Sequence, residues 1–321
     1  MQLKRVLFLP LAVLLCAVCF TKEAQEKVAF GESWSYVVAG YENEVNPKSV
    51  ITDLCYFSAD VNEYGEISSV PKREALPSWY TGRVHLVTTC ESRSLSHFVI
   101  DPKYKVTKRI VRTLAKATQD YDGLQIDWEL IPSRDAANYQ KFLKSLRKAL
   151  GDEKMLTICV HARTAQREND VEDYATLAPL VDRIFIMAYD EHWGGSSPGA
   201  VSSMSWCGRV ADYGLATIPP EKLIVGLPFY GRTWTSPSLA KAWYHSGITR
   251  TARENGSPDV VRTGEIPHFS FKTQVRVEGW YDDAHSLLAR CQMLKGKGVQ
   301  NVGFWRLGQE DPAFWEHLSL E

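Results

Sequence analysis

The sequence lacks an excess of charge of either sign, because its 37 Lys and Arg residues face 38 Asp and Glu residues and give a formal net charge of −1. That balance excludes the basic surface typical of a nucleic-acid-binding protein. The chain also lacks internal repeats and low-complexity segments. With 45% hydrophobic and 23% charged residues it matches globular averages, so disordered and fibrous proteins are excluded too. The protein classes that remain are an enzyme and a binding protein, and 321 residues are enough to form a large core.

Motifs for metals, cofactors and disulfides are missing as well. Five cysteines remain beyond Cys16 and Cys19, with no C-x-x-C pair and no zinc-like spacing among them. No H-E-x-x-H, Walker loop or dinucleotide fingerprint is present. We therefore expect no metal, no cofactor, no disulfide framework and no cysteine nucleophile.

One apolar run is present, at the N-terminus. Lys4 and Arg5 precede the uncharged stretch Val6–Phe20, which is shorter than the roughly 20 residues of a membrane-spanning helix. This pattern predicts a signal peptide over residues 1–24, with an uncleaved anchor or a lipoprotein signal as alternatives. The remaining residues, 25–321, are expected to be extracellular, periplasmic or attached to the cell envelope. Any contact with a membrane would be made through the N-terminal anchor.

Short apolar runs recur along the rest of the chain. Eight of them predict strands: Ser35–Tyr41, Val50–Phe57, Val84–Thr89, Leu124–Leu130, Met155–Val160, Ile184–Tyr189, Leu223–Phe229 and Val302–Leu307. Three segments with helical periodicity lie between them: Lys105–Thr118, Ser133–Leu150 and Ala284–Lys295. Together they predict an α/β fold, a TIM-type (β/α)8 barrel. The mixed stretch at about 232–280 predicts a small insertion between strand 7 and the last helices, and only Glu42–Ser49 separates the first two strands.

The segment D-G-L-Q-I-D-W-E-L, Asp122–Leu130, is the most informative one. Because strand side chains alternate between two faces, Gln125, Asp127 and Glu129 share one face, and the intervening apolar residues share the other. In a barrel the polar set points inward, toward the end where active sites lie. Two neighbouring carboxylates raise at least one pKa, which favours general-acid chemistry at Glu129. The alternative is an edge strand with a solvated acidic face.

These residues resemble the D-G-x-D-x-D-x-E signature of glycoside hydrolase family 18, the chitinases and related N-acetylglucosaminidases. Three further segments are similar to family motifs in the same order: M-A-Y-D (Met187–Asp190), G-L-P-F-Y-G-R (Gly226–Arg232) and G-F-W-R-L-G (Gly303–Gly308). The four motifs span Asp122 to Gly308, and the resemblance implies a retaining glycosidase.

The resemblance implies a role for each matching residue. Glu129 is the implied general acid and base, and Asp127 is the residue that orients the substrate's N-acetyl group, whose carbonyl acts as the nucleophile. The implied substrate-binding positions are Asp122, Gln125, Met187, Tyr189, Asp190, Tyr230, Arg232 and Trp305. The implied partner is a polysaccharide or oligosaccharide that contains N-acetylglucosamine: chitin, peptidoglycan or an N-glycan core. The odd cysteine count and Gln125 favour peptidoglycan, and we expect a monomer that binds no nucleic acid.

Gln125 departs from the signature, since chitinases of the family carry Asp there. An amide cannot ionise, but it can donate a hydrogen bond, so we expect Gln125 to hold Asp127 in its ionised form. The alternative is a catalytically silent, chitinase-like carbohydrate-binding protein.

Other patterns compete less well. G-S-S-P-G (Gly195–Gly199) has the form of an esterase elbow around Ser197, but Pro198 lacks the N–H group that such a site needs. His192 and Trp193 are expected to shape a cleft wall. Trp234, Trp243 and Trp280 fit equally well as sugar platforms or as the core of the insertion.

Overall fold

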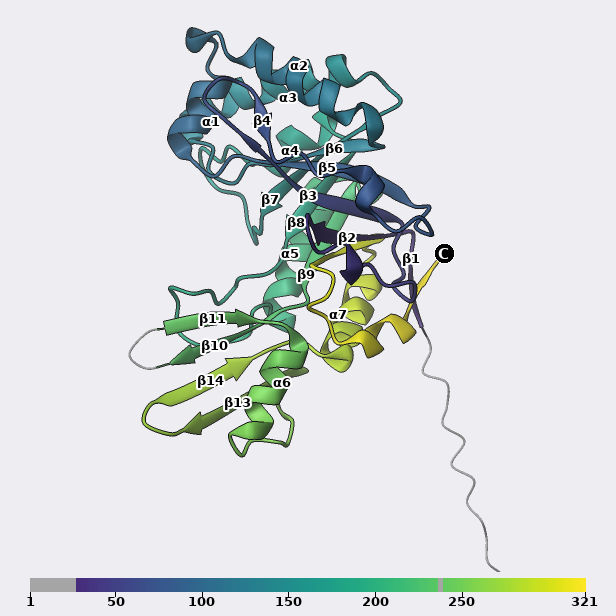
Figure 1. Cartoon of the computed structure of the whole chain (residues 1–321). Helices are drawn as coiled ribbons and strands as arrows, with labels where there is room; N and C mark the ends of the chain where they lie inside the picture. The colour runs from purple at the N-terminus through teal and green to yellow at the C-terminus, as the bar shows by residue number, and fades with distance from the viewer. Residues whose placement is uncertain (1–26, 236–238) are drawn as a thin grey trace, which may run out of the picture.

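The computed structural model describes residues 27–235 and 239–321 (Figure 1). The signal peptide predicted for residues 1–24 lies outside these residues. Within them, no helix combines the length and the apolar character needed to cross a membrane.

Eight parallel strands close into a barrel. They are β2 (Glu32–Val38), β3 (Asp53–Val61), β5 (Arg83–Thr89), β6 (Gly123–Asp127), β7 (Met155–His161), β8 (Arg183–Met187), β9 (Leu223–Pro228) and β15 (Asn301–Trp305). Each strand pairs with the next in that order, and β15 pairs back with β2. The predicted barrel is therefore confirmed, with strand boundaries that differ by a few residues. Outside the ring, β4 (Ile67–Ser68) pairs with β3, and β1 (Val28–Phe30) pairs with β16 (Leu318–Leu320).

Helices surround the barrel (Figure 1). They are α1 (Arg93–Ile100), α2 (Thr107–Ala117), α3 (Ala136–Leu150), α4 (Tyr174–Leu177), α5 (Met204–Thr217) and α7 (Ala284–Gly296). The three predicted helices correspond to α2, α3 and α7. Between β2 and β3 only the 3-10 turn η1 (Glu42–Glu44) forms, as the short spacing predicts. Further 3-10 turns are η2 (Arg73–Ala75), η3 (Pro102–Tyr104), η4 (Thr118–Asp120), η5 (Ser133–Asp135), η6 (Ala178–Leu180) and η7 (Pro312–Glu316).

Strand alternation separates two cores. On β6, Leu124 and Ile126 are fully buried in the layer between the strands and the helices, and the Trp128 ring stacks on Phe142 of α3 at 4.8 Å. The residues that fill the inside of the barrel form a second cluster: Trp34, Tyr36, Cys55, Val87, Cys159, Phe185 and Ile224.

The Phe185 ring occupies space that two neighbouring strands leave open. A Cβ atom at Gly226 of β9 or at Gly303 of β15 would lie 2.1 Å from this ring. Only glycine fits at either position, so a bulky ring can fill the barrel beneath the cleft.

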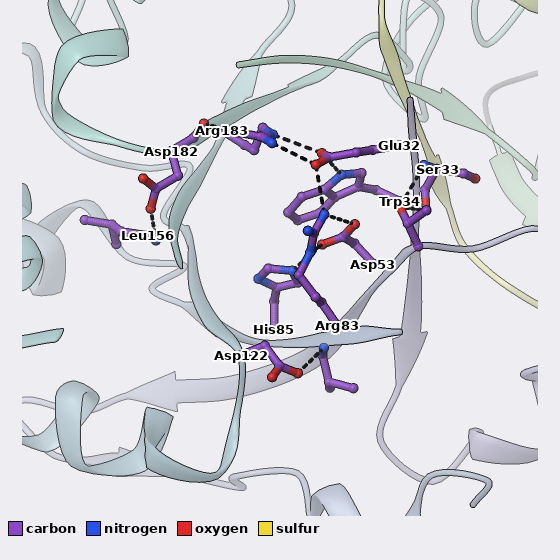
Figure 2. A network of polar contacts seen from close by, with 12 residues as sticks. Glu32, Ser33, Trp34, Asp53, Arg83, His85, Asp122, Leu156, Asp182 and Arg183 are labelled. Carbon is purple, nitrogen blue, oxygen red and sulfur yellow. Dashed lines mark hydrogen bonds and ion pairs between the residues drawn. The ribbon is translucent and has the colours of Figure 1, made fainter. Parts of the chain in front are cut away.

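An ion-pair network closes the end of the barrel where the strands begin (Figure 2). Arg83 binds both oxygens of Asp53 at 2.6 and 2.7 Å and reaches Glu32 at 2.8 Å. His85 Nε2 lies 2.7 Å from Asp53 Oδ1, and Arg183 binds Glu32 at 2.7 and 2.9 Å. Asp53 and His85 are fully buried, so these contacts replace water for groups that burial would otherwise destabilise.

The insertion forms its own antiparallel sheet, which Figure 1 places across the barrel from α1–α3. Its elements are β10 (Gly231–Thr235), β11 (Leu239–Trp243), α6 (His245–Glu254), β12 (Val261–Thr263), β13 (Ile266–Lys272) and β14 (Arg276–Trp280). Helix α6 was not predicted, because its buried stripe consists of only Ile248 and Ala252. These two residues pack with Phe269 and Tyr281 into a small separate core.

Candidate active site

A cleft of about 830 Å³ opens at the carboxyl ends of the barrel strands. Its walls are formed by Tyr36, Phe57, Glu91, Asp127, Glu129, His161, Ala162, Arg163, Arg167, Met187, Tyr189, Asp190, Trp193, Trp206, Tyr230 and Trp305. These residues come from strands far apart in the sequence and from the segments that follow them, since the closed barrel brings all of its strand ends together. This is the end of a TIM-type barrel where active sites are built.

Two carboxyl groups at the end of β6 face the cleft. Asp127 is the last residue of the strand and is 8% exposed, whereas the Glu129 side chain, two residues later, is 50% exposed. Burial, and then the charge of Glu129, raise the pKa of Asp127 to about 7. Burial also raises the pKa of Glu129. Both groups can therefore hold a proton at higher pH than an ordinary carboxyl group, which general acid catalysis requires.

Gln125 lies beneath the cleft and does not line it. Its side chain is fully buried, and its Oε1 accepts a hydrogen bond of 2.6 Å from the Tyr36 phenol. The hydrogen bond expected from Gln125 to Asp127 is absent, because neither Gln125 Nε2 nor Asp127 Oδ1 has a partner among the described residues. Burial raises the pKa of Asp127 to about 7, and Gln125 donates no hydrogen bond that would lower it, so Gln125 does not hold Asp127 in its ionised form as expected.

A third carboxyl group reaches the cleft from β8. Asp190 has a left-handed backbone conformation (φ 58°), which Asp tolerates better than most residues and which turns the chain at the end of the strand. Its Oδ1 accepts hydrogen bonds from the Tyr230 phenol at 2.6 Å and from Arg232 Nη2 at 2.9 Å. Asp190 is thus held in place by a residue that follows β9 and by one on β10.

Aromatic rings line much of the cleft. The Trp305 ring lies 5.0 Å from those of Tyr36 and Phe57, and Trp193 is 57% exposed. Flat apolar rings beside carboxyl groups suit a ligand with both apolar faces and hydroxyl groups, as a sugar ring has.

A histidine that the sequence patterns did not predict faces Glu129. His161 is the last residue of β7, and its Nε2 lies 3.4 Å from Glu129 Oε2. Its Nδ1 lies 2.8 Å from Glu172, which is only 5% exposed. The sequence pattern that could have indicated His161 is a polar residue directly after an apolar strand, but the predicted strand ended at Val160.

Most of the predicted site residues meet in this cleft. Seven of them line it: Glu129, Asp127, Met187, Tyr189, Asp190, Tyr230 and Trp305. Arg232 does not line the cleft, but it contacts two residues that do: its Nη2 pairs with Asp190, and its guanidinium lies over the Tyr230 ring. Asp122 lies at the start of β6, where its Oδ2 accepts from the backbone N–H of Val84 and pairs with Arg73, both at 2.8 Å (Figure 2 shows the first of these bonds). The expectation that Asp122 binds substrate therefore does not hold.

The tryptophans of the insertion belong to its own structure. Trp280 stacks on His268 at 4.3 Å, Trp243 packs against the small core of the insertion, and Trp234 is buried. None of the three is among the described residues that line the cleft, whereas Trp193 is, as expected. Ser197 is exposed in a loop, and His192 lies near its backbone carbonyl rather than its hydroxyl group. That arrangement gives no support to an esterase.

One group of side chains has the spacing of a cation site. His97, Asp101 and Asp135 lie close together, and His97 Nδ1 is 2.8 Å from Asp135. None of the three lines the cleft, so they take no part in its chemistry.

Comparison with known proteins agrees with this geometry. A model of the family described as glycosyl hydrolases family 18 matches residues 91–310. The chain is 24% identical to the cortical fragment-lytic enzyme of Bacillus anthracis, over 93% of this chain and 75% of that protein. It is 30% identical to a putative sporulation-specific glycosylase, YdhD, of Bacillus subtilis, over 60% of this chain and 48% of that protein.

Solved structures share the fold. The spore cortex-lytic enzyme SleL of Bacillus cereus superposes with a TM-score of 0.82 at 22% identity, over 92% of this chain and 76% of that one. A chitinase from Chromobacterium violaceum superposes with a TM-score of 0.77 at 21% identity, over 89% of this chain and 96% of that one.

Proposed function

Because the chain belongs to glycosyl hydrolase family 18 and is a glycoside hydrolase, we propose that it is an exported, retaining enzyme that cleaves β-1,4-linked glycans containing N-acetylglucosamine. Glu129 acts as its general acid and base. The observation that carries this proposal is the pair of carboxyl groups, Asp127 and Glu129, in an aromatic-lined cleft at the carboxyl ends of the strands. Residues 25–321 act as one monomeric catalytic domain, and residues 1–24 direct export.

The reaction proceeds in two steps. In the first, Glu129 donates its proton to the glycosidic oxygen while the substrate's acetamido carbonyl oxygen attacks the anomeric carbon, so the leaving sugar departs and a cyclic oxazolinium ion forms. Asp127 stabilises the positive charge on this ion. In the second step, the Glu129 carboxylate takes a proton from water, whose oxygen opens the ring at the anomeric carbon and restores the original configuration. Asp190 and Tyr189 hold the acetamido group during both steps.

This mechanism predicts a strict dependence on the N-acetyl group. A chitobioside whose reacting sugar carries a free amine should be hydrolysed at least about 1000-fold more slowly, because an internal nucleophile provides a very large effective concentration. Turnover of matched fluorogenic substrates measures this difference, and competitive inhibition by the amine compound verifies that it still binds. Comparable rates for both substrates would indicate a nucleophile supplied by the protein and would contradict the proposal.

Within this substrate class, one basic residue of the cleft, Arg167, favours peptidoglycan over chitin. The Arg163 guanidinium is already paired with carboxylates of the protein, since its Nε binds Asp170 at 2.8 Å and its Nη2 binds Glu172 at 3.1 Å. Arg167 also lines the cleft but forms no ion pair within the part of the chain that the structure describes. Chitin is neutral, whereas the muramic acid units of peptidoglycan carry carboxyl groups or peptides. Two of the Bacillus relatives are named for the lysis of spore cortex or its fragments, and we propose that peptidoglycan strands are the substrate.

Replacing Arg167 with Gln should therefore change selectivity. We expect kcat/KM for peptidoglycan strands to fall about tenfold relative to kcat/KM for chito-oligosaccharides, because a charge-assisted hydrogen bond is lost. The matched control is Arg112→Gln on the exposed face of α2, which should leave the ratio of the two values unchanged. An unchanged ratio in the Arg167 variant would exclude this residue as the determinant of selectivity.

The silent binding protein is the weaker alternative. It was suggested by Gln125, but that residue lies beneath the cleft, while Asp127 and Glu129 keep the carboxyl groups that the chemistry uses.

A further inference from the structure

The imidazole of His161 lies between two carboxyl groups on different segments. Its Nε2 faces Glu129 Oε2 at 3.4 Å, and its Nδ1 faces Glu172 Oε1 at 2.8 Å. The backbone N–H of His161 also donates to Glu172 Oε2 at 3.0 Å. One carboxylate thus holds both the ring and the backbone of a residue whose other ring nitrogen points at the proposed acid.

The loop after β7 is folded to keep Glu172 in this position. Arg163 binds Glu172 at 3.1 Å and Asp170 at 2.8 Å, and Asp170 accepts from the backbone N–H of Glu172 at 3.1 Å. From α4, the Tyr174 phenol donates to the backbone carbonyl of His161 at 2.5 Å. Glu172 is nearly inaccessible to solvent, so the network fixes its carboxylate rather than leaving it mobile.

The charges around His161 favour its protonated form. The hydrogen bond to Glu172 raises the pKa of His161, and the charges of Glu172 and Glu129 act in the same direction against burial and Arg163. A hydrogen-bonded carboxylate on Nδ1 also fixes the orientation of the ring. Glu129 therefore faces an imidazole whose other nitrogen is held by a carboxylate.

Glu129 is also surrounded by other acidic groups. Glu91 after β5, Asp127 on β6 and Asp190 after β8 line the same cleft, so His161 is the basic group directly facing Glu129 in a largely acidic setting. Gln125 lies beneath the cleft and cannot ionise, so it adds no charge near Glu129.

We propose that His161, held by Glu172, is a positioning residue for Glu129. It orients the carboxyl group and stabilises the carboxylate that forms each time Glu129 gives its proton to the glycosidic oxygen. This inference rests on the proposed function. It assigns to β7 the electrostatic support that Gln125 on β6 does not provide.

The variant His161→Gln tests the proposal through the pH dependence of kcat/KM. The alkaline limb of that profile reports the loss of the proton from the general acid. Without the neighbouring cation the pKa of Glu129 should rise, so the limb should move to higher pH by about 1 unit. We expect kcat to fall about tenfold, since the carboxylate that forms in the first step is less stable, while KM changes by less than about twofold.

Further variants make the test specific. Glu172→Gln removes the carboxylate that holds His161, but the charge of Glu172 also raises the pKa of Glu129 directly, so its alkaline limb should move less than that of His161→Gln. His161→Asn removes the same imidazole and serves if His161→Gln does not fold. His97→Gln is the matched control, because His97 has the same 2.8 Å contact with a carboxylate but lies outside the cleft. It should leave the limb in place.

The inference is overturned if folded His161→Gln keeps the wild-type alkaline limb, or if only KM changes. Failure of the proposed function is a separate result. If Glu129→Gln retained full activity, the general acid would be another group, whatever the His161 variants showed.

Discussion

In a Glu129→Gln variant, hydrolysis of N-acetylchitobiosides and peptidoglycan strands is expected to fall by about 1000-fold or more. The amide has nearly the same shape as the carboxyl group, but it can neither donate a proton to the leaving oxygen nor take one from water. General acid–base catalysis typically contributes about 100-fold to 10,000-fold, and here one residue serves both steps. Single-turnover and steady-state rates on a fluorogenic chitobioside measure the loss.

Binding should survive this substitution. The cleft keeps Trp305, Trp193 and Asp190, which do not depend on Glu129 for their positions. Titration calorimetry with a chito-oligosaccharide should give a Kd within about threefold of the wild-type value. Glu91→Gln is the matched control, because it removes a second carboxylate of the same cleft without removing the proposed acid. If both variants lost activity equally, the general charge of the cleft would be responsible, and the role assigned to Glu129 would be wrong.

The second large effect concerns stability. Replacing Asp53 with Asn is expected to lower the free energy of unfolding by about 3 kcal/mol, because it removes the buried partner that Arg83 and His85 share. Urea unfolding at pH 7 measures this change. The network lies at the opposite end of the barrel from the cleft, so the folded variant should retain the wild-type pH profile of activity.

The pH dependence of this difference has a definite sign. Burial would raise the pKa of Asp53, but hydrogen bonds from His85 and Arg83 outweigh it, and the pKa is lowered. A group whose pKa is lowered by folding contributes stability above its unfolded pKa, about 3.9 for Asp, and that contribution is lost as the pH falls through the folded value. The gap between wild type and Asp53→Asn should therefore be constant near neutrality and narrow below about pH 4.

A control on the same strand separates this effect from a general sensitivity of β3. Asp60 is exposed at the other end of β3 and accepts one hydrogen bond from Thr89. Asp60→Asn should lower the free energy of unfolding by less than about 1 kcal/mol. Equal losses in the two variants would show that the buried network is not the source of the stability.

The sequence predicted the centre of the site because a strand imposes a period of two. That rule puts Asp127 on the face opposite Leu124 and Ile126, as the structure has them, and the family resemblance points to Glu129, which faces the cleft two residues after the end of β6. The order of the eight apolar runs predicted the barrel for a similar reason, since parallel strands buried on both faces leave a clear signal in the sequence.

The rest of the site depends on contacts between segments that no local pattern encodes. Glu172 lies in a loop, and its place beside His161 follows from ion pairs with Arg163 and from the turn at Asp170. Asp122 was wrongly expected in the cleft because it begins the family motif, whereas its carboxylate pairs with Arg73 and the backbone of Val84 at the start of β6. Helix α5 escaped prediction because Gly208 and Gly214 interrupt its pattern, although Gly214 is needed there to let Ile186 and Leu223 approach.

The way in which the ring closes has a consequence for the order of events after synthesis. Strand β2 is among the first to emerge, yet its neighbour β15 comes from the last part of the described chain, and β1 must likewise wait for β16. Until then β2 can pair on one side only, so the barrel stays open. Closing so long a loop is slow, because the entropy of the intervening chain must be lost first. During most of its synthesis the chain therefore lacks the strand that closes the barrel and stays unfolded. The proposed export requires an unfolded chain to pass through a narrow membrane channel, and this passage can precede folding.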